Sequence, residues 1–300
     1  MIWVDGTPGP FSPESPRVVE RARRGAAFVE GHTQSAVAAR LRAAGSVYAE
    51  DEADVLLSAA ETAEDLERMV RERVAGRPLE YTVGWAWFCG LKIVVEPGVF
   101  VPRVRTEFLA HQAAARLSAH VVVVDLCCGT GALGAALLAA APEAAVYAVD
   151  RDPAAVRCAR RNLTGGRVYE GNLYDPLPEE LAGRVTLMVA NAPYVPTAAL
   201  AQLPREARLH EAPMALDGGP DGLDILRRVA DGAPTWLAAG GHLLVESSEA
   251  QGPPVAAYFR SRGLLAAIAY SEKLEATVVT GTKLPALDAQ SRGMNWQGSG

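Results

Sequence analysis

A short run of β-branched residues followed by closely spaced glycines constrains this chain more than any other feature. Residues 121–124 are consecutive valines, the apolar pattern of a strand buried on both faces of a parallel sheet. Gly129 and Gly131 then interrupt the strand, and residues 132–141 are rich in alanine and leucine, which favour a helix. The order of strand, glycine turn and helix predicts the first unit of a doubly wound α/β sheet, in which ligands bind at that turn.

The spacing of the glycines fits two different cofactors. Gly129, Gly131 and Gly134 follow the G-x-G-x-x-G pattern of dinucleotide-binding proteins. Asp150 ends a second apolar run, residues 145–149. A carboxylate at this place accepts hydrogen bonds from ribose hydroxyls, whether the ribose belongs to NAD or to S-adenosylmethionine.

Asp125 favours one of these two cofactors. It precedes Gly129 at the end of the predicted strand, and we expect its carboxylate to face the ligand cleft. NAD has no cation to place there, whereas S-adenosylmethionine carries an ammonium and a sulfonium group, and a carboxylate attracts both. The pattern therefore favours S-adenosylmethionine, with NAD as the alternative.

The composition indicates a globular protein. The chain has 300 residues, of which 49% are hydrophobic and 21% charged, so a disordered chain is not expected. The net charge of −6 argues against a broad surface that binds nucleic-acid phosphates. Four cysteines, at positions 89, 127, 128 and 158, lack metal-binding spacing, so we expect reduced thiols, no metal site and a cytoplasmic protein. Neither a signal peptide nor a membrane-spanning run is evident.

The N-terminal quarter has a helical pattern. Residues 1–15 are rich in proline and glycine, and we expect a flexible arm there. Apolar residues recur at three- and four-residue steps over residues 16–75, which predicts a small N-terminal helical domain. Thr33 or Ser35 is the expected cap of one helix, and Thr62 that of another.

The chain changes character after the helical pattern ends. Residues 76–105 predict a linker with a β-hairpin, whose strands are expected over residues 81–88 and 91–95. Residues 106–284 predict a second, larger domain, and residues 285–300 a flexible tail.

Strands and helices alternate through this larger domain. Strands are predicted over residues 121–125, 145–149, 167–170, 185–190, 241–246, 265–270 and 275–280, and helices over residues 132–141, 153–163, 222–230 and 253–262. Such alternation, with two strands in succession at the end, predicts an α/β fold with a Rossmann-like sheet that is mostly parallel and has an antiparallel C-terminal edge.

A second motif, Asn191-Ala192-Pro193-Tyr194, follows the strand predicted over residues 185–190, where doubly wound sheets bind substrate. An amide or aryl NH₂ group is a poor nucleophile because its lone pair is delocalised. We expect the Asn191 side-chain oxygen and the Ala192 carbonyl to accept both N–H bonds, which would aim the lone pair at a methyl group. Pro193 is expected to hold Ala192 extended, and Tyr194 to pack on the flat substrate group. A simple Asn-x-Pro turn is the alternative.

Several motifs together resemble the HemK/PrmC family of class I methyltransferases, which methylate the side-chain nitrogen of a protein glutamine. The resemblance covers about residues 33 to 283, and its motifs are residues 76–81, 88–91, 97–103, 125–133, 146–150, 191–194 and 210–223. It implies a helical domain that helps to hold a partner, a catalytic domain, and a protein substrate with an exposed glutamine. The candidate partner is the Gly-Gly-Gln loop of a peptide-chain release factor.

The resemblance also implies the residues of the site. Asn191, Ala192, Pro193 and Tyr194 are the expected catalytic residues that hold the glutamine. The expected contacts of S-adenosylmethionine are Asp125, Cys127, Cys128, Gly129, Thr130, Gly131, Asp150, Asn172, Leu173 and Asn191.

Four departures from the family pattern indicate a divergent branch. Ala192 replaces the first proline of Asn-Pro-Pro-Tyr, and residues 102–107 lack a proline and an acid of the family's Pro-Arg-Pro-Glu-Thr/Ser-Glu. Residues 127–128 are cysteines where small residues are usual, and Glu246 is followed by two serines rather than Ile-Gly. Two alternatives stay open: an adenine-amino methyltransferase acting on nucleic acid, which the acidic composition disfavours, and a cofactor-binding module without catalysis.

Other polar residues near these motifs are interpreted as structural. Arg103 is expected either near the cofactor or in a contact between domains. His210 and Glu211 are expected to order a loop, since methyl transfer from a sulfonium needs little help from a general base. Residues 217–222 predict a tight turn that caps a helix, and Glu246 is expected to hold a nearby loop.

Overall fold

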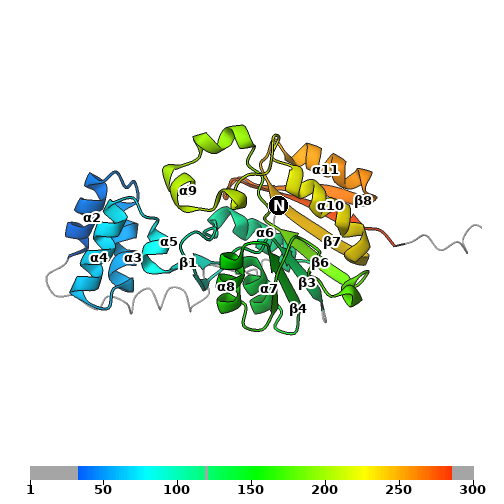
Figure 1. The fold of residues 1–300 in the computed structure, drawn as a ribbon, viewed down its shortest axis with the longest axis horizontal. Helices are drawn as coiled ribbons and strands as arrows, with labels where there is room; N and C mark the ends of the chain where they lie inside the picture. Colours follow the sequence, from blue (N-terminus) through cyan, green and yellow to red (C-terminus); the bar gives the residue numbers. More distant parts are fainter. Residues whose placement is uncertain (1–32, 119–120, 286–300) are drawn as a thin grey trace, which may run out of the picture.

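A computed structural model describes residues 33–118 and 121–285 of the chain. The predicted arm, the predicted helical domain up to residue 32 and residues 286–300 of the predicted tail lie outside these described residues. Figure 1 shows an elongated molecule, with a small bundle of helices at one end and a larger body built on a sheet at the other.

The N-terminal bundle contains three helices among the described residues, α2 (Gln34–Ala43), α3 (Ala49–Ala59) and α4 (Ala63–Val74). Their apolar faces form a core of their own, in which Leu56 and Leu66 are fully buried. Two predicted caps are confirmed: Thr33 Oγ1 accepts the Ala36 N–H at 3.2 Å, and Thr62 Oγ1 accepts the Asp65 N–H at 3.1 Å. The helical prediction therefore holds for this part of the chain.

The body is a sheet of seven strands in the order β5-β4-β3-β6-β7-β9-β8. Neighbouring strands from β5 to β7 are parallel, whereas β9 is antiparallel to both β7 and β8. The predicted sheet, mostly parallel with an antiparallel C-terminal edge, is confirmed. The strands are β3 (Val122–Leu126), β4 (Ala145–Asp150), β5 (Arg167–Glu170), β6 (Val185–Ala190), β7 (Leu237–Ser247), β8 (Leu264–Ser271) and β9 (Ala276–Lys283).

Two apolar cores lie on opposite faces of this sheet. Successive residues of a strand point to opposite faces, so Val123 belongs to one core and Val124 to the other. The first core is covered by α6 (Glu107–Ala114), α7 (Ala132–Ala140) and α8 (Pro153–Asn162), and the second by α10 (Asp224–Trp236) and α11 (Gly252–Ser261). Because helices cover both faces, the central strands are continuous apolar runs.

The hairpin prediction is wrong at its start. Strands β1 (Trp85–Phe88) and β2 (Leu91–Val94) pair as expected, but residues 79–83 form helix α5 (Leu79–Val83) instead of the first half of a strand. Helix α5 begins after Pro78, whose carbonyl accepts the Thr82 N–H at 3.0 Å, and it ends at Gly84 with φ of 80°. Local helix signals therefore override the β-branched and aromatic residues of this segment.

The hairpin is packed on the body of the molecule. Asn162 of α8 accepts the Val94 N–H at 2.8 Å through Oδ1 and donates to the Val94 carbonyl at 2.9 Å through Nδ2. Phe88 and Ile93 are buried in the first core of the sheet. The segment predicted as a linker thus belongs structurally to the sheet-based body.

Short helices that the sequence did not predict occur between β6 and α10. They are η3 (Thr197–Gln202), α9 (Arg205–His210) and η4 (Pro213–Ala215). Figure 1 shows α9 beside the sheet, between the bundle and α10. Arg73 of α4 bonds Glu206 of α9 at 2.7 Å and Glu52 of α3 at 2.8 Å, so this segment is tied to the bundle.

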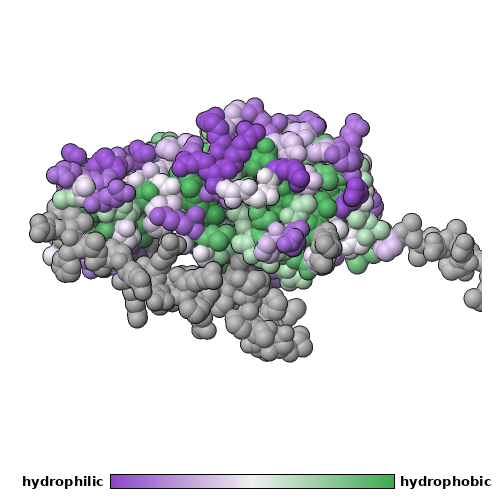
Figure 2. Space-filling view, turned by 90° about the horizontal axis from the view of Figure 1, so that it is seen from below, coloured by the Kyte–Doolittle hydropathy of each residue, from purple (hydrophilic) through white to green (hydrophobic). Residues whose placement is uncertain are grey.

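The surface contains both hydrophobic and hydrophilic areas. On the face that Figure 2 shows, hydrophobic residues gather over the middle of the body, and hydrophilic residues follow one margin. Some large apolar side chains are exposed, as is usual for a folded protein; Trp87 and Leu265 are examples. Among the residues that the structure describes, no helix has both the length and the apolar character that a membrane crossing needs.

Candidate active site

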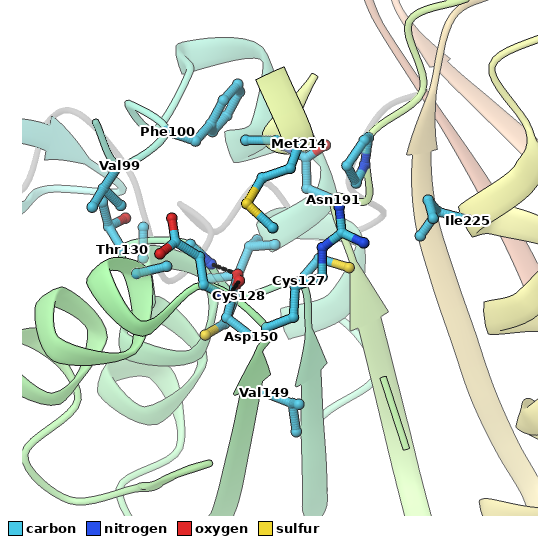
Figure 3. A pocket seen from close by; sticks show the side chains of 18 of the residues that line it. Val99, Phe100, Cys127, Cys128, Thr130, Val149, Asp150, Asn191, Met214 and Ile225 are labelled. Atoms are coloured by element: carbon cyan, nitrogen blue, oxygen red, sulfur yellow. Dashed lines mark hydrogen bonds between the residues drawn. The ribbon is translucent and has the colours of Figure 1, made fainter. Parts of the chain in front are cut away.

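A cavity lies at the carboxyl ends of β3, β4 and β6, where a doubly wound sheet binds its ligands (Figure 3). Its walls include the glycine loop after β3, the acid that ends β4, the segment before α6, and the residues after β6, together with residues after β5, in η4 and in α10. Its lining includes Val99, Phe100, Pro102, Thr106, Cys127, Cys128, Gly129, Thr130, Leu133, Asp150, Asn172, Leu173, Asn191, Pro193, Met214, Ile225 and Arg228.

The glycine loop has an unusual backbone. Cys127, Gly129 and Gly131 have φ of 56°, 53° and 75°, the left-handed region that glycine tolerates best. A Cβ at Gly129 would meet nothing within 4 Å, so its backbone is uncovered, whereas a Cβ at Gly131 would lie 3.1 Å from Ala159 Cβ. The first glycine therefore allows close approach of a ligand, and the second allows α8 to pack against the loop.

Asp150 lies in the cavity at the end of β4, as predicted. Its Oδ2 accepts the Gly129 N–H at 2.8 Å and its Oδ1 accepts the Asp152 N–H at 2.9 Å. Burial raises the pKa of Asp150, and these two hydrogen bonds oppose that effect. Each oxygen keeps a further lone pair, so the carboxylate is held in place and can still accept bonds from two ribose hydroxyls.

The expectation that Asp125 faces the cleft is wrong. Its side chain is fully buried, is not part of the cavity wall, and accepts the Gly134 N–H of α7 at 3.0 Å through Oδ2. Burial, followed by repulsion from Asp150, raises the pKa of Asp125 to about 7. Helix α7 starts directly after the glycine loop, so the carboxylate is drawn under the first turn of the helix and away from the cleft. Its Oδ1 has no hydrogen-bond partner among the described residues.

Asn191 follows β6 and lines the cavity. Its Nδ2 donates to Oγ1 of Thr106 at 3.2 Å, and Thr106 is itself buried in the cavity wall. The side-chain oxygen has no partner among the described residues. The amide therefore has its donor side engaged and its acceptor side available, which is the orientation that the chemistry of the motif requires.

The next two residues of the motif differ in their position relative to the cavity. Ala192 is 1% exposed, belongs to the second core, and is not part of the cavity wall. Neither its N–H nor its carbonyl bonds to another described residue. Pro193 lines the cavity, and the peptide bond that precedes it is trans. The acceptor role of the Ala192 carbonyl stays a prediction.

Tyr194 is not part of the cavity wall, and its packing on a substrate stays a prediction. Its hydroxyl donates to Oε1 of Glu246 at 3.0 Å, and the guanidinium carbon of Arg105 lies 5.9 Å from its ring centroid. Arg105 Nε also lies 3.3 Å from Glu246 Oε1. Because Glu246 at the end of β7 binds the tyrosine, it holds the loop after β6, as was predicted.

The glycine-rich segment before α10 packs directly behind the motif. A Cβ at Gly218 would lie 2.7 Å from the Pro193 carbonyl oxygen, and one at Gly222 would lie 2.3 Å from that of Tyr194. Gln251 Nε2 donates to the same Tyr194 oxygen at 2.8 Å. Residues 218–222 therefore support Pro193 and Tyr194. Gly218 and Gly222 are needed for this close packing as well as for the predicted turn.

The polar residues interpreted as structural have structural contacts. Arg103 forms an ion pair with the buried Glu211 and lies over the ring of Phe100. Glu211 also accepts the Val101 N–H, and the His210 carbonyl accepts from the hydroxyl of Tyr81 at 3.3 Å. These contacts order the segment before α6 that forms one wall of the cavity.

Several cavity residues were not predicted as site residues. Phe100, Met214 and Ile225 supply apolar wall, and in Figure 3 the Met214 side chain lies between Phe100 and Asn191. Arg228 of α10 donates to Asn172 Oδ1 at 2.9 Å. Phe100 and Met214 lie in motifs of the family resemblance, residues 97–103 and 210–223, but nothing in the spacing of these cavity residues distinguishes them from core or surface residues.

The described residues fit S-adenosylmethionine. The uncovered backbone at Gly129 permits close approach, and the Asp150 carboxylate retains acceptor capacity for a ribose. Asp125 supplies a buried oxygen without a partner behind the loop, and in its ionised form it would favour a cation in the cavity. Asn172 and Leu173 lie in the same wall. No group of three potential metal ligands occurs among the described residues.

Comparison with known proteins defines the class. A family model for the methyltransferase small domain matches residues 90–222. A methyltransferase structure from Pyrococcus furiosus shares the fold, with a TM-score of 0.51 and 14% identity over 74% of this chain and all of that one. With the glycine loop and Asp150, these findings define a class I methyltransferase whose cofactor is S-adenosylmethionine.

Curated relatives define the family more closely. The release factor glutamine methyltransferase of Geobacter sulfurreducens is 40% identical over 199 residues, which are 65% of this chain and 69% of that protein. That of Mycolicibacterium smegmatis is 43% identical over 188 residues, 61% of this chain and 66% of that one. A Streptomyces pristinaespiralis 4-amino-L-phenylalanine/4-methylamino-L-phenylalanine methyltransferase is 40% identical over 203 residues, 65% of this chain and 69% of that protein. The chain belongs to the HemK/PrmC family of release factor glutamine methyltransferases.

Proposed function

We propose that this enzyme transfers a methyl group from S-adenosylmethionine to the side-chain amide nitrogen of a protein glutamine, with a peptide-chain release factor as the partner. The observation that carries the proposal is the orientation of Asn191. Its donor side is bonded to Thr106, so its oxygen is available to accept an N–H bond from the amide to be methylated.

The protein's contribution to this reaction is positioning. S-adenosylmethionine supplies a methyl group on a positively charged sulfur. Asn191 Oδ1, and by prediction the Ala192 carbonyl, accept the two N–H bonds of the glutamine amide. This holds the nitrogen lone pair toward the sulfur-bound carbon, and such alignment replaces a random encounter by an oriented one.

The reaction balances without a strong base. A carbon–nitrogen bond forms, the carbon–sulfur bond breaks, and the electron pair of that bond leaves with the sulfur. The amide nitrogen then releases one proton, which water accepts because an N-protonated amide is strongly acidic. Asp150 is engaged by two backbone N–H groups, which suits it to binding rather than to proton transfer.

An aryl amine on a small molecule is the second candidate acceptor. The Streptomyces pristinaespiralis relative is named for an acceptor of this kind, and it is as similar to this chain as the first release factor enzyme. Phe100, Met214 and Ile225 give the cavity an apolar wall against which a flat ring can pack. Nucleic acid is a weaker candidate, because the net charge is −6.

Transfer of labelled methyl groups distinguishes these acceptors. The enzyme is incubated with labelled S-adenosylmethionine and either a release factor, the same factor with its Gly-Gly-Gln glutamine replaced by alanine, or 4-amino-L-phenylalanine. The proposal expects label on the factor and none on its alanine variant. Label on 4-amino-L-phenylalanine alone would support the second candidate and overturn the first. A cytoplasmic location stays a prediction that accompanies the first candidate.

A further inference from the structure

We infer that Thr106 is a positioning residue for methyl transfer, which acts by holding the Asn191 amide with its oxygen toward the acceptor. The inference rests on the proposed function, because only an acceptor with an N–H bond needs that oxygen. Thr106 ends the short helix η1 (Val104–Thr106), and Asn191 is 85 residues further along the chain. The structure brings them together at a distance of 3.2 Å between Oγ1 and Nδ2.

The chemistry of an amide explains why such a partner is needed. A rotation of the Asn191 side-chain amide exchanges its oxygen and its NH₂ group with little change in shape. With the NH₂ group toward the cavity, two donors would face the N–H bonds of the acceptor and would repel them. A hydroxyl can accept from Nδ2 or donate to Oδ1, and in the structure the Thr106 hydroxyl accepts from Nδ2, which leaves Oδ1 toward the cavity.

Thr106 is suited to this task by its own environment. It is 4% exposed and forms part of the cavity wall, so its side chain is largely shielded from bulk water and has little freedom to move. Its N–H donates to the Arg103 carbonyl at 3.0 Å, and Arg103 is in turn paired with Glu211. The hydroxyl is thus presented from a fixed backbone.

Each variant that tests this inference differs from the wild-type enzyme by only one small group on one side chain. Thr106→Val keeps the shape of the side chain and removes the acceptor, whereas Thr106→Ser keeps the hydroxyl and removes a methyl group. Thr186→Val is a matched control. Thr186 lies at the opposite end of the strand that leads to Asn191, and its Oγ1 accepts the Val122 N–H and donates to the Val122 carbonyl, both at 3.0 Å.

The expected result is a loss of turnover that depends on Asn191. Thr106→Val should lower kcat about tenfold, equivalent to about 1.4 kcal/mol, while the affinity for S-adenosylhomocysteine changes less than about twofold. Thr106→Ser and Thr186→Val should keep kcat within about threefold of the wild type. In an Asn191→Ala background, Thr106→Val should have no further effect, since it acts only through the asparagine.

A second measurement does not depend on the acceptor. In amide NMR spectra of the enzyme with S-adenosylhomocysteine, the side-chain NH₂ signals of Asn191 can be assigned by their loss in Asn191→Ala. Thr106→Val should shift these signals toward those of an amide without a protein partner, and Thr106→Ser should not.

The outcomes separate the two proposals. If the wild type methylates neither acceptor, the proposed function fails, and the NMR shift still decides whether Thr106 holds Asn191. If the wild type is active, the inference is overturned by a Thr106→Val enzyme with normal kcat. A Thr106→Ser enzyme with a kcat as low as that of Thr106→Val would also overturn the inference. So would a double variant, Thr106→Val with Asn191→Ala, in which the two losses of kcat multiply.

Discussion

The buried carboxylate of Asp125 should make the stability of this enzyme fall as the pH rises through the weakly acid range. Its pKa is about 7 in the folded protein, compared with 3.8 for an ordinary aspartate, and burial is the main cause. Below about pH 4 the group is protonated in both the folded and the unfolded state, so it has no effect. Between about pH 4 and pH 7 the unfolded chain ionises first, which lowers the free energy of unfolding, and above pH 7 the full penalty is present.

The magnitude follows from the size of the shift. One pKa unit corresponds to 1.36 kcal/mol, so a shift of about three units gives about 4 kcal/mol. Asp125→Asn keeps an oxygen for the Gly134 N–H and cannot ionise. Its free energy of unfolding, relative to the wild type, should therefore rise by about 4 kcal/mol between about pH 4 and pH 8.

Urea denaturation of both proteins across this pH range measures the difference, since other titrating groups are the same in both. Asp217→Asn is a control with the opposite sign. Hydrogen bonds, first from the Thr197 hydroxyl and then from the Gly219 N–H, lower the pKa of Asp217. The ionised carboxylate therefore adds to the free energy of unfolding, and this contribution is lost only as the pH falls below the ordinary aspartate range. A difference between Asp125→Asn and the wild type that stays constant from pH 4 to pH 8 would refute the reasoning.

Three further predictions concern the cofactor and the motif. Asp150→Ala should weaken binding of S-adenosylhomocysteine by about 1–3 kcal/mol in calorimetry, through loss of charged hydrogen bonds, and unchanged affinity would contradict the ribose role. Gly222→Ala should destabilise the protein more than the control Gly183→Ala and also lower activity. Both glycines have positive φ, but only at Gly222 would a Cβ meet the Tyr194 carbonyl, so equal effects in urea denaturation would count against this support. Ala192→Pro should stay within about 1 kcal/mol of wild-type stability and keep its activity, because the Ala192 N–H has no described partner; a folded but inactive variant would show that the geometry differs.

Much of the fold could be predicted because its signals are local. Strands β5 and β6 were predicted with the bounds that the structure has, Arg167–Glu170 and Val185–Ala190, and β6 is a nearly continuous apolar run. Helix α5 was missed because Thr82 and Val83 favour strands. In the structure Pro78 and Gly84 bound the segment as the two ends of a helix, and their effect outweighs that preference. The short helices that include α9 lack a strong periodic pattern and depend on contacts with distant elements.

The site was predictable where one motif carries the chemistry. Asp150 ends one parallel strand and Asn191 directly follows another, and the ends of such strands meet at one edge of a sheet. Thr106 and Met214 could not be found in this way, because their place in the cavity depends on how separate segments pack. The direction of the Asp125 side chain could not be predicted either. The sequence indicated that Asp125 ends a strand, but not that its carboxylate would bind the Gly134 N–H of α7 and turn away from the cleft.

The central claim is that Asn191 presents its oxygen to the amide nitrogen that is methylated. The most direct test compares the wild type with Asn191→Ala in two measurements, the affinity for S-adenosylhomocysteine and the rate of methyl transfer to a release factor glutamine. The account predicts nearly unchanged affinity and a rate that falls about 100-fold or more, as expected when a positioning hydrogen bond at the reacting centre is lost. Near-normal methylation by Asn191→Ala would contradict it and would leave Asn191-Ala-Pro-Tyr as a turn without a part in the chemistry.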